Sequence, residues 1–158
     1  MKTVILYATK TGTTEKCANL LAAKLKDVTV VNLRNATLDL NSFDCIIVGG
    51  SIRIGALNKY AKKFIEKNKE ILKDKRAAYF FCCGATEQLD VMFSKNISKD
   101  LLESAICYDT FGGEMDINKQ KGFDKFIVKM VTKNKDSKQP EILNDNIEKF
   151  AKKIIIST

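Results

Sequence analysis

Short apolar runs alternate along the chain with segments whose apolar residues recur at helical spacing. The apolar runs lie at 4–7, 28–33, 44–50, 77–83 and 105–111. The third run is unbroken and closed by glycine, which is typical of a strand buried on both faces of a parallel sheet. Helical periodicity covers 13–26, 57–72, 91–104 and the chain from about 144 onward. This alternation predicts a parallel sheet with helices on both faces.

The clearest chemical signal lies between the first predicted strand and the first predicted helix. Four threonines and one glycine fall within Thr9–Thr14, where the helix should begin. Backbone amides at a helix N-terminus have no intrahelical partner and carry partial positive charge, so they attract anions. Gly12 permits a sharp turn or close backbone approach to a ligand. We therefore predict a phosphate site here; the alternative is a threonine-capped helix that binds nothing.

Two well-known phosphate loops do not fit this segment. The dinucleotide fingerprint needs three spaced glycines, and the nucleoside-triphosphate loop ends in Gly-Lys-Ser/Thr. Here Gly12 stands alone and Thr13-Thr14 follows it. The sequence thus favours a mononucleotide with a terminal phosphate. Because ligands of open parallel sheets bind beyond the carboxyl ends of the strands, we expect Ser51–Ala56 and Cys83–Gln88 to flank its ring system.

Composition narrows the choice of function. The 158 residues, 45% hydrophobic and 29% charged, suit one soluble globular domain spanning 1–158. With no apolar stretch of membrane-spanning length and no secretory signal pattern, we expect a cytoplasmic protein.

The chain has no histidine, which excludes histidine-based catalysis and histidine metal sites. We expect no metal site, and the five cysteines fit small buried thiols better than a redox pair at Cys82-Cys83.

These features together resemble the flavodoxins. Thr9-Lys10-Thr11-Gly12-Thr13-Thr14 matches that family's FMN-phosphate motif, and the element order matches over 3–113 and the last helix. A closer resemblance is to the branch that contains menaquinone-dependent protoporphyrinogen IX dehydrogenase, carried by Gly50–Gly55 and Phe123–Met130. The resemblance implies a three-layer α/β/α sandwich. Its five-stranded parallel sheet would have the order 2-1-3-4-5, with an insertion before the last helix.

The resemblance also implies noncovalent FMN and no side chain that acts as a catalytic acid or base. The phosphate would be held by Thr9, Lys10, Thr11, Gly12, Thr13 and Thr14. One side of the isoalloxazine would be lined by Ser51, Ile52, Arg53, Ile54 and Gly55. The other side, or the ribityl chain, would meet Cys83, Gly84 and Ala85, with Gly112 and Gly113 completing the cofactor-binding set.

The chain departs from typical flavodoxins in charge and in aromatic content. Its net charge is +8, whereas typical flavodoxins are acidic. Neither of the two loops predicted to flank the ring has the aromatic residue that typical flavodoxins stack on the flavin. Arg53 would lie at the ring edge, although a surface arginine paired with a carboxylate is an equal alternative. Positive charge and fewer stacked rings both favour the reduced, anionic flavin. We therefore expect a higher redox potential than that of a low-potential flavodoxin.

A lysine-rich insertion, 114–143, separates the fifth predicted strand from the last helix. Between Lys119 and Lys138 there are seven lysines and two aspartates, and an apolar face runs from Phe123 to Val131. A basic amphipathic helix of this kind can lie on an anionic membrane or an acidic partner. It can equally pack its apolar face on the domain with solvated lysines. No nucleic-acid-binding module is recognisable, so we expect no nucleic-acid partner.

Three functions remain open at this stage. The leading hypothesis is an FMN-binding, electron-transferring flavoprotein with a redox partner protein or a quinone. The second is a protoporphyrinogen IX dehydrogenase-type oxidoreductase that passes electrons to a membrane quinone, with peripheral membrane contact through 119–138. The third is a flavodoxin-fold binding module without redox activity. The oligomeric state, the electron donor and the acceptor are not indicated by the sequence.

Overall fold

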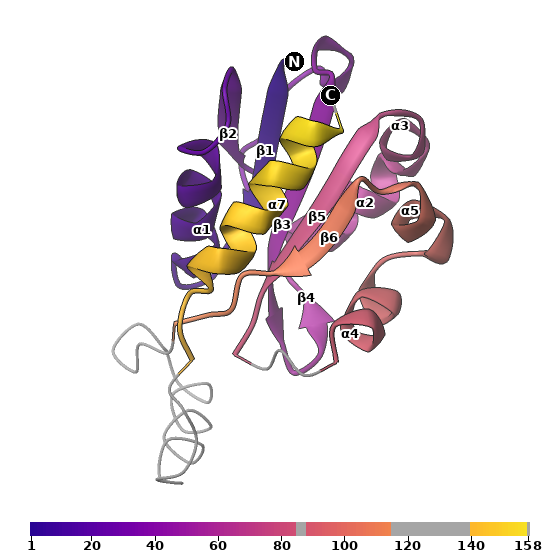
Figure 1. Ribbon diagram of the computed structural model, residues 1–158. Helices are drawn as coiled ribbons and strands as arrows, with labels where there is room; N and C mark the ends of the chain where they lie inside the picture. The colour runs from indigo at the N-terminus through magenta and orange to yellow at the C-terminus, as the bar shows by residue number, and fades with distance from the viewer. Residues whose placement is uncertain (85–87, 115–139, 158) are drawn as a thin grey trace, which may run out of the picture.

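A parallel sheet forms the centre of the computed structural model, which describes residues 1–84, 88–114 and 140–157 (Figure 1). The strand order is β2-β1-β3-β5-β6, which confirms the predicted order once the short β4 is set aside. The five parallel strands are β1 (Thr3–Ala8), β2 (Val28–Asn32), β3 (Cys45–Arg53), β5 (Arg76–Cys82) and β6 (Cys107–Thr110). The additional strand β4 (Ala56–Leu57) pairs antiparallel with the end of β3, in a segment expected to be loop.

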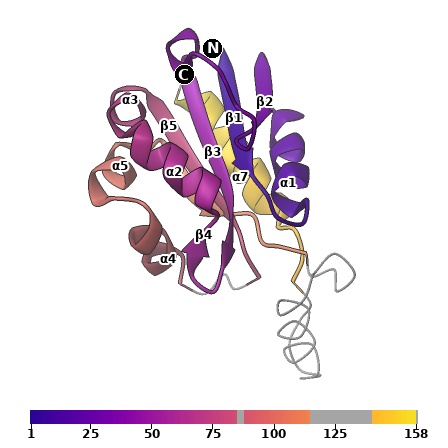
Figure 2. The same cartoon turned by 180° about the vertical axis from the view of Figure 1, so that it is seen from behind.

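Helices cover both faces of the sheet, as predicted. One face is covered by α1 (Thr13–Ala22) and α7 (Asn144–Ile156), and the same two helices lie behind the sheet in Figure 2. The other face carries α2 (Lys59–Lys67), α3 (Lys69–Asp74), α4 (Leu89–Asn96) and α5 (Lys99–Ser104). A 3₁₀ turn, η1 (Leu40–Ser42), precedes β3. Among the described residues no helix is both long enough and apolar enough to cross a membrane.

Strand alternation divides the apolar residues into two cores. Ile5, Ile47 and Phe80 belong to the core beneath α1 and α7. Their chain neighbours Leu6, Val48 and Phe81 belong to the core beneath α2 to α5. Because successive side chains of a strand point to opposite faces, one continuous apolar run supplies both cores.

Two predicted helices are each broken into two. The segment 57–72 changes direction at Asn68, whose side chain donates to the carbonyl of Phe64 at 2.8 Å and ends α2. The segment 91–104 is interrupted at Ile97, which is extended at φ −128° and ψ 137°. Helical spacing of apolar residues continues across both breaks, because the helices on either side pack on the same core. The periodicity therefore located the helical face correctly but not the ends of the helices.

The predicted lysine-rich insertion, 114–143, lies mostly in residues 115–139, outside the described part of the chain. Its two flanks are fixed beside each other. Gly112 forms an antiparallel bridge with Ile142, and Leu143 donates its amide hydrogen to the carbonyl of Phe111 at 2.9 Å. The described residues on either side of the gap therefore lie next to each other, beyond the end of β6.

Gly49 of β3 lies in a tightly packed part of the core. A Cβ added there would overlap the ring of Phe80, which itself stacks on Phe111 with 4.5 Å between ring centroids. We predict that Gly49→Ala lowers the free energy of unfolding by about 1–3 kcal/mol, because an overpacked core must shift to accept the methyl group. Urea denaturation measures this, with the exposed Lys26→Ala as a control that should change stability by less than about 0.5 kcal/mol. Equal effects of the two substitutions would contradict the packing argument.

Candidate functional site

The register of the sheet brings the ends of four strands to one edge. Ala8 pairs with Gly50, Gly50 with Phe81, and Phe81 with Thr110. Because the strands are parallel, the chain leaves all four at the same edge. The predicted site segments Thr9–Thr14, Ser51–Gly55, Cys83–Gly84 and Gly112–Gly113 all begin here. Residue Ala85, predicted to contact the cofactor, lies outside the described residues.

The predicted phosphate loop forms an uncapped helix start. Gly12 precedes α1 with φ 96°, a left-handed conformation that other residues rarely adopt, and no side chain caps the helix. The Thr9 hydroxyl instead accepts a hydrogen bond from the Gly12 amide at 2.9 Å. Thr11, Gly12 and Thr13 are half-buried. The first amides of α1 therefore have no intrahelical partner and no side-chain cap.

Thr14 supplies an independent sign of a ligand. Its side chain is fully buried, and its hydroxyl oxygen has no hydrogen-bond partner. The Cys82 thiol is near enough for Thr14 to lower that thiol's pKa, but the contact does not meet the geometry of a hydrogen bond. A buried hydroxyl without a partner is costly, and such groups in native proteins call for an explanation. An anion held at the start of α1 would provide the missing partner.

The acidic side chains near this loop are each bound by a neighbour. The Tyr7 hydroxyl donates to Glu15 Oε1 at 2.8 Å, and burial together with this bond raises the pKa of Tyr7. Lys16 Nζ lies 2.6 Å from Glu114 Oε1 and so joins α1 to the segment after β6.

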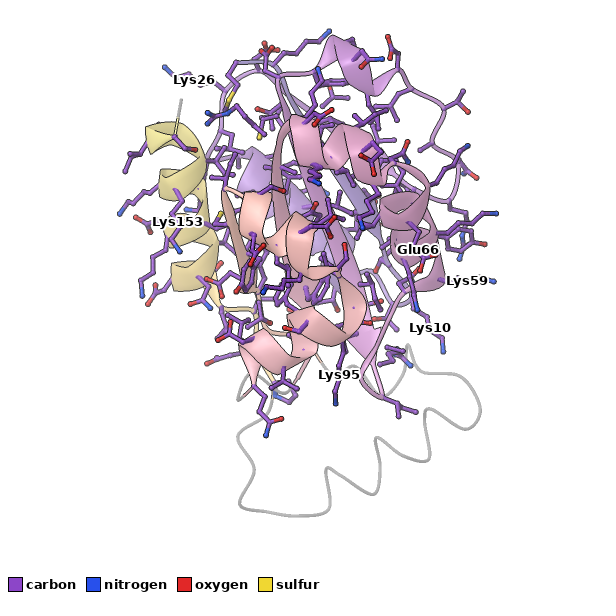
Figure 3. The ribbon with its side chains drawn as sticks, turned by 90° about the vertical axis from the view of Figure 1, so that its right-hand side faces the viewer. Lys10, Lys26, Lys59, Glu66, Lys95 and Lys153 are labelled. Atoms are coloured by element: carbon purple, nitrogen blue, oxygen red, sulfur yellow. The ribbon has the colours of Figure 1, made fainter. Side chains whose placement is uncertain are left out.

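Lys10 is exposed and projects at the same end of the molecule as Lys95 (Figure 3). The end of the sheet that carries the site thus presents lysines.

The second predicted loop is a β-hairpin. Ile52 pairs with Leu57 and Arg53 with Ala56, so Ile54 and Gly55 form a two-residue turn. Ser51, Ile52 and Arg53 are half-buried, whereas Ile54 is 89% exposed. Gly50 leaves room for this arm, because a Cβ there would lie 2.5 Å from Leu57 Cδ1. The hairpin therefore projects past the sheet edge as an extension of β3.

The third and fourth segments pack on each other. Cys83 is half-buried, with its Sγ 3.4 Å from Met92 Sδ and 3.9 Å from Thr110 Oγ1. A Cβ on Gly113 would lie 3.2 Å from the carbonyl carbon of Cys83, a tight contact that shows how closely the two backbones approach. Gly112 has φ 70° and Gly84 is exposed. The site segments after β5 and β6 are therefore in direct contact.

The cysteines do not form a redox pair in this arrangement. None of the five cysteines forms a disulfide. Cys82 is buried on the α1 side, whereas Cys83 contacts Met92 of α4. Hydrogen bonding to Cys17 and burial raise the pKa of the Cys82 thiol well above its usual value. A neutral, buried thiol is a poor nucleophile, which disfavours a role for Cys82-Cys83 in thiol chemistry.

Several residues that build the site carried no signal in the sequence. Tyr7 and Glu15 look like an ordinary strand residue and an ordinary exposed helix residue. Asn96, at the end of α4, bonds to the hairpin nearly forty residues earlier. Long-range side-chain hydrogen bonds of this kind have no periodicity, so no pattern in the sequence could have indicated them.

Comparisons with known proteins agree with the fold. A family model described as "Flavodoxin domain" matches residues 4–141. The protoporphyrinogen IX dehydrogenase [quinone] of Escherichia coli K12 is 24% identical over 171 aligned positions, which cover 98% of this chain and 94% of that protein.

Solved structures show the same fold. The two-electron reduced flavodoxin of Megasphaera elsdenii has a TM-score of 0.54 and 22% identity, covering 68% of this chain and 84% of that chain. A flavodoxin from the domain Archaea has a TM-score of 0.52 and 18% identity, covering 96% and 99%. A flavoprotein in complex with FMN from Lactobacillus acidophilus NCFM has a TM-score of 0.51 and 18% identity, covering 69% and 92%.

The fold and the site define a doubly wound α/β protein whose first helix begins without a side-chain cap at the carboxyl edge of its sheet. The match to the family model covers residues 4–141, which is most of the chain, and therefore establishes the family. This chain belongs to the flavodoxin domain family.

We predict that replacing threonine by valine has opposite effects on stability at two buried positions. Thr14→Val removes a hydroxyl without a partner, so the ligand-free protein should gain about 1 kcal/mol of stability. Thr110→Val removes a hydroxyl that donates to the Phe81 carbonyl at 3.1 Å and accepts from the Gly112 amide at 3.3 Å. That change should cost about 1–3 kcal/mol.

Chemical denaturation of the ligand-free variants measures both effects. If Thr14→Val destabilises the protein as much as Thr110→Val does, the Thr14 hydroxyl already has a partner within the protein. It would then no longer indicate a ligand.

Proposed function

We propose that this protein is an FMN-binding, electron-transferring flavoprotein. The observation that carries the proposal is the uncapped start of α1 together with the buried, unpartnered hydroxyl of Thr14. A dianionic phosphate monoester would accept hydrogen bonds from those amides and from the threonine hydroxyls of the loop. Family membership supports FMN as the mononucleotide, and the intact loop argues against a module that has lost its cofactor.

The chain's residues bind and orient the cofactor. When bound, FMN supplies one- and two-electron transfer. Thr9, Thr11, Thr13 and Thr14 would hold its phosphate, with Gly12 allowing close approach of the backbone. The hairpin Ser51–Gly55 would flank one side of the ring, and Cys83 with Gly84 the other side. No described residue of these segments is aromatic, so aliphatic side chains and backbone would meet the ring.

Arg53 supports the expectation of a raised potential. It lies half-buried in β3, one residue before the turn. A positive charge roughly 10 Å from the ring, at an effective dielectric of about 40, would stabilise an added electron by roughly 0.8 kcal/mol. We therefore propose a reduction potential above that of low-potential flavodoxins.

The proposal predicts that the purified protein takes up added FMN, and a titration that follows flavin fluorescence measures the affinity. Thr14→Val should weaken binding about tenfold to a hundredfold, since a hydrogen bond to a charged group is lost. Replacing Thr11 and Thr13 together by alanine should also weaken it. Thr29→Val, at an exposed position of β2, is the matched control and should leave affinity unchanged. No uptake by the native protein, or equal affinity of all variants, would overturn the proposal.

A dehydrogenase of the protoporphyrinogen type is the second candidate. It is favoured by the alignment with the Escherichia coli enzyme, which extends over nearly the whole of both chains. In that case the acceptor would be a quinone, and the basic segment 119–138 would bring the protein to an anionic membrane. That segment lies outside the described residues, so membrane contact rests on its sequence alone.

An assay with protoporphyrinogen IX and a menaquinone analogue separates the two candidates. For an electron carrier we expect no turnover above that of free FMN, with the Escherichia coli enzyme as positive control. Turnover that rises when the quinone is supplied in anionic rather than neutral vesicles would favour the dehydrogenase and its membrane contact.

A further inference from the structure

The turn of the β3–β4 hairpin is conformationally strained. Ile54 and Gly55 have φ of 50° and 73°, the pattern of a type I′ turn, which asparagine followed by glycine forms most readily. A β-branched residue with positive φ is a genuine outlier. Ile54 is also 89% exposed, so no burial of its side chain within the described structure offsets the strain. Some other interaction must hold this turn in place.

Asn96, the last residue of α4, provides that interaction. Its side-chain Oδ1 accepts a hydrogen bond from the Leu57 amide at 2.8 Å. Its Nδ2 donates to the carbonyl of Gly55 at 3.0 Å and to that of Met92 at 2.8 Å. One side chain therefore bonds to the hairpin backbone within the turn and again on β4. A single amide group satisfies three backbone groups, two of which belong to the strained arm.

Helix α4 connects this arm to the opposite side of the site. Near the start of the helix, Asp90 Oδ1 accepts a hydrogen bond from the Tyr108 hydroxyl of β6 at 3.1 Å. In the middle, Met92 Sδ contacts Cys83 Sγ at 3.4 Å. At its end, Asn96 holds the hairpin. The two segments proposed to flank the ring are thus fixed to one short helix.

We propose that Asn96 is a positioning residue that holds the turn Arg53–Ala56 beside the cofactor and thereby sets the redox potential of the bound flavin. The inference rests on the proposed function, because it assigns the hairpin to the flavin ring. The three hydrogen bonds of the Asn96 side chain are to backbone groups. Asn96 acts through the backbone of Gly55 and Leu57, and through them it fixes where the charge of Arg53 lies.

Asn68 offers a matched control. It directly follows the last residue of α2, and its Nδ2 donates to the carbonyl four residues earlier, that of Phe64, at 2.8 Å. Asn96 makes the equivalent bond to Met92. The two residues differ in that Asn96 also bonds to the hairpin. Asn68→Ala therefore reports the loss of a helix-end bond alone.

The first experiment measures amide hydrogen exchange in the FMN-free protein. In Asn96→Ala we expect the Leu57 amide to exchange about tenfold to a hundredfold faster, because a bond protecting it is lost. Asn68→Ala should leave that amide unchanged. Unchanged exchange of Leu57 in Asn96→Ala would overturn the proposal. Should Asn96→Ala fail to fold, Asn96→Asp replaces it in the second experiment below, because it keeps an acceptor for Leu57 but sets a carboxylate against the Gly55 carbonyl.

The second experiment measures the reduction potential and the affinity of bound FMN in the same variants. Asn96→Ala should lower the potential and weaken FMN several-fold, because Arg53 is no longer held beside the ring, while Asn68→Ala should change neither. Adding Ile54→Asn to Asn96→Ala should restore part of the potential, because Asn-Gly forms the turn without help. Exchange of the Leu57 amide should stay fast in this double variant, because its acceptor on Asn96 is still missing. Equal effects of the Asn96 and Asn68 variants, or no rescue, would overturn the role.

The two proposals fail separately. If the native protein takes up no FMN, the proposed function fails, while hydrogen exchange still decides whether Asn96 holds the hairpin. If FMN binds normally and the potential does not respond to Asn96→Ala, the positioning role fails and the cofactor assignment stands.

Discussion

The site depends on a helix that begins without a side-chain cap. In most helices a serine, threonine, aspartate or asparagine at the N-cap satisfies a free amide. Here Gly12 occupies that position, and the hydroxyl of Thr9 bonds to Gly12 itself rather than to the first turn of α1. The helix start is therefore left with unsatisfied donors next to the buried hydroxyl of Thr14. An anion is the simplest group that satisfies all of them at once.

The surrounding charges keep this position suitable for an anion. Glu15 stands in the first turn of α1, where its negative charge would compete with a ligand. Its carboxylate accepts a hydrogen bond from the Tyr7 hydroxyl, and Lys16 pairs with Glu114 across the site. Lys16 and Glu114 offset each other's charge, so the positive character of the loop comes from its backbone amides and from the exposed Lys10. Backbone donors fixed by the fold need little reorganisation when a ligand arrives.

The sequence predicted what depends on local patterns and missed what depends on contacts between distant residues. Apolar runs and helical spacing predicted the strand order and both helical layers, and the threonine-rich motif marked where α1 begins. Helix ends at Asn68 and Ile97 were missed because apolar spacing continues across them. The hairpin was missed because Ile54-Gly55 is an unusual type I′ turn, and Asn96 because it acts across the fold.

The unusual turn and the uncapped helix break local rules at the same edge of the sheet. Natural sequences are otherwise consistent from residue propensity to fold, and departures concentrate where binding or chemistry is required. A turn optimised for stability would carry asparagine at position 54, and a helix optimised for stability would carry a cap at position 12 and no orphaned hydroxyl at position 14. Each departure leaves the ligand-free protein less stable than its fold permits. Their location around the ends of β1 and β3 is what a cofactor site, rather than relaxed packing, would produce.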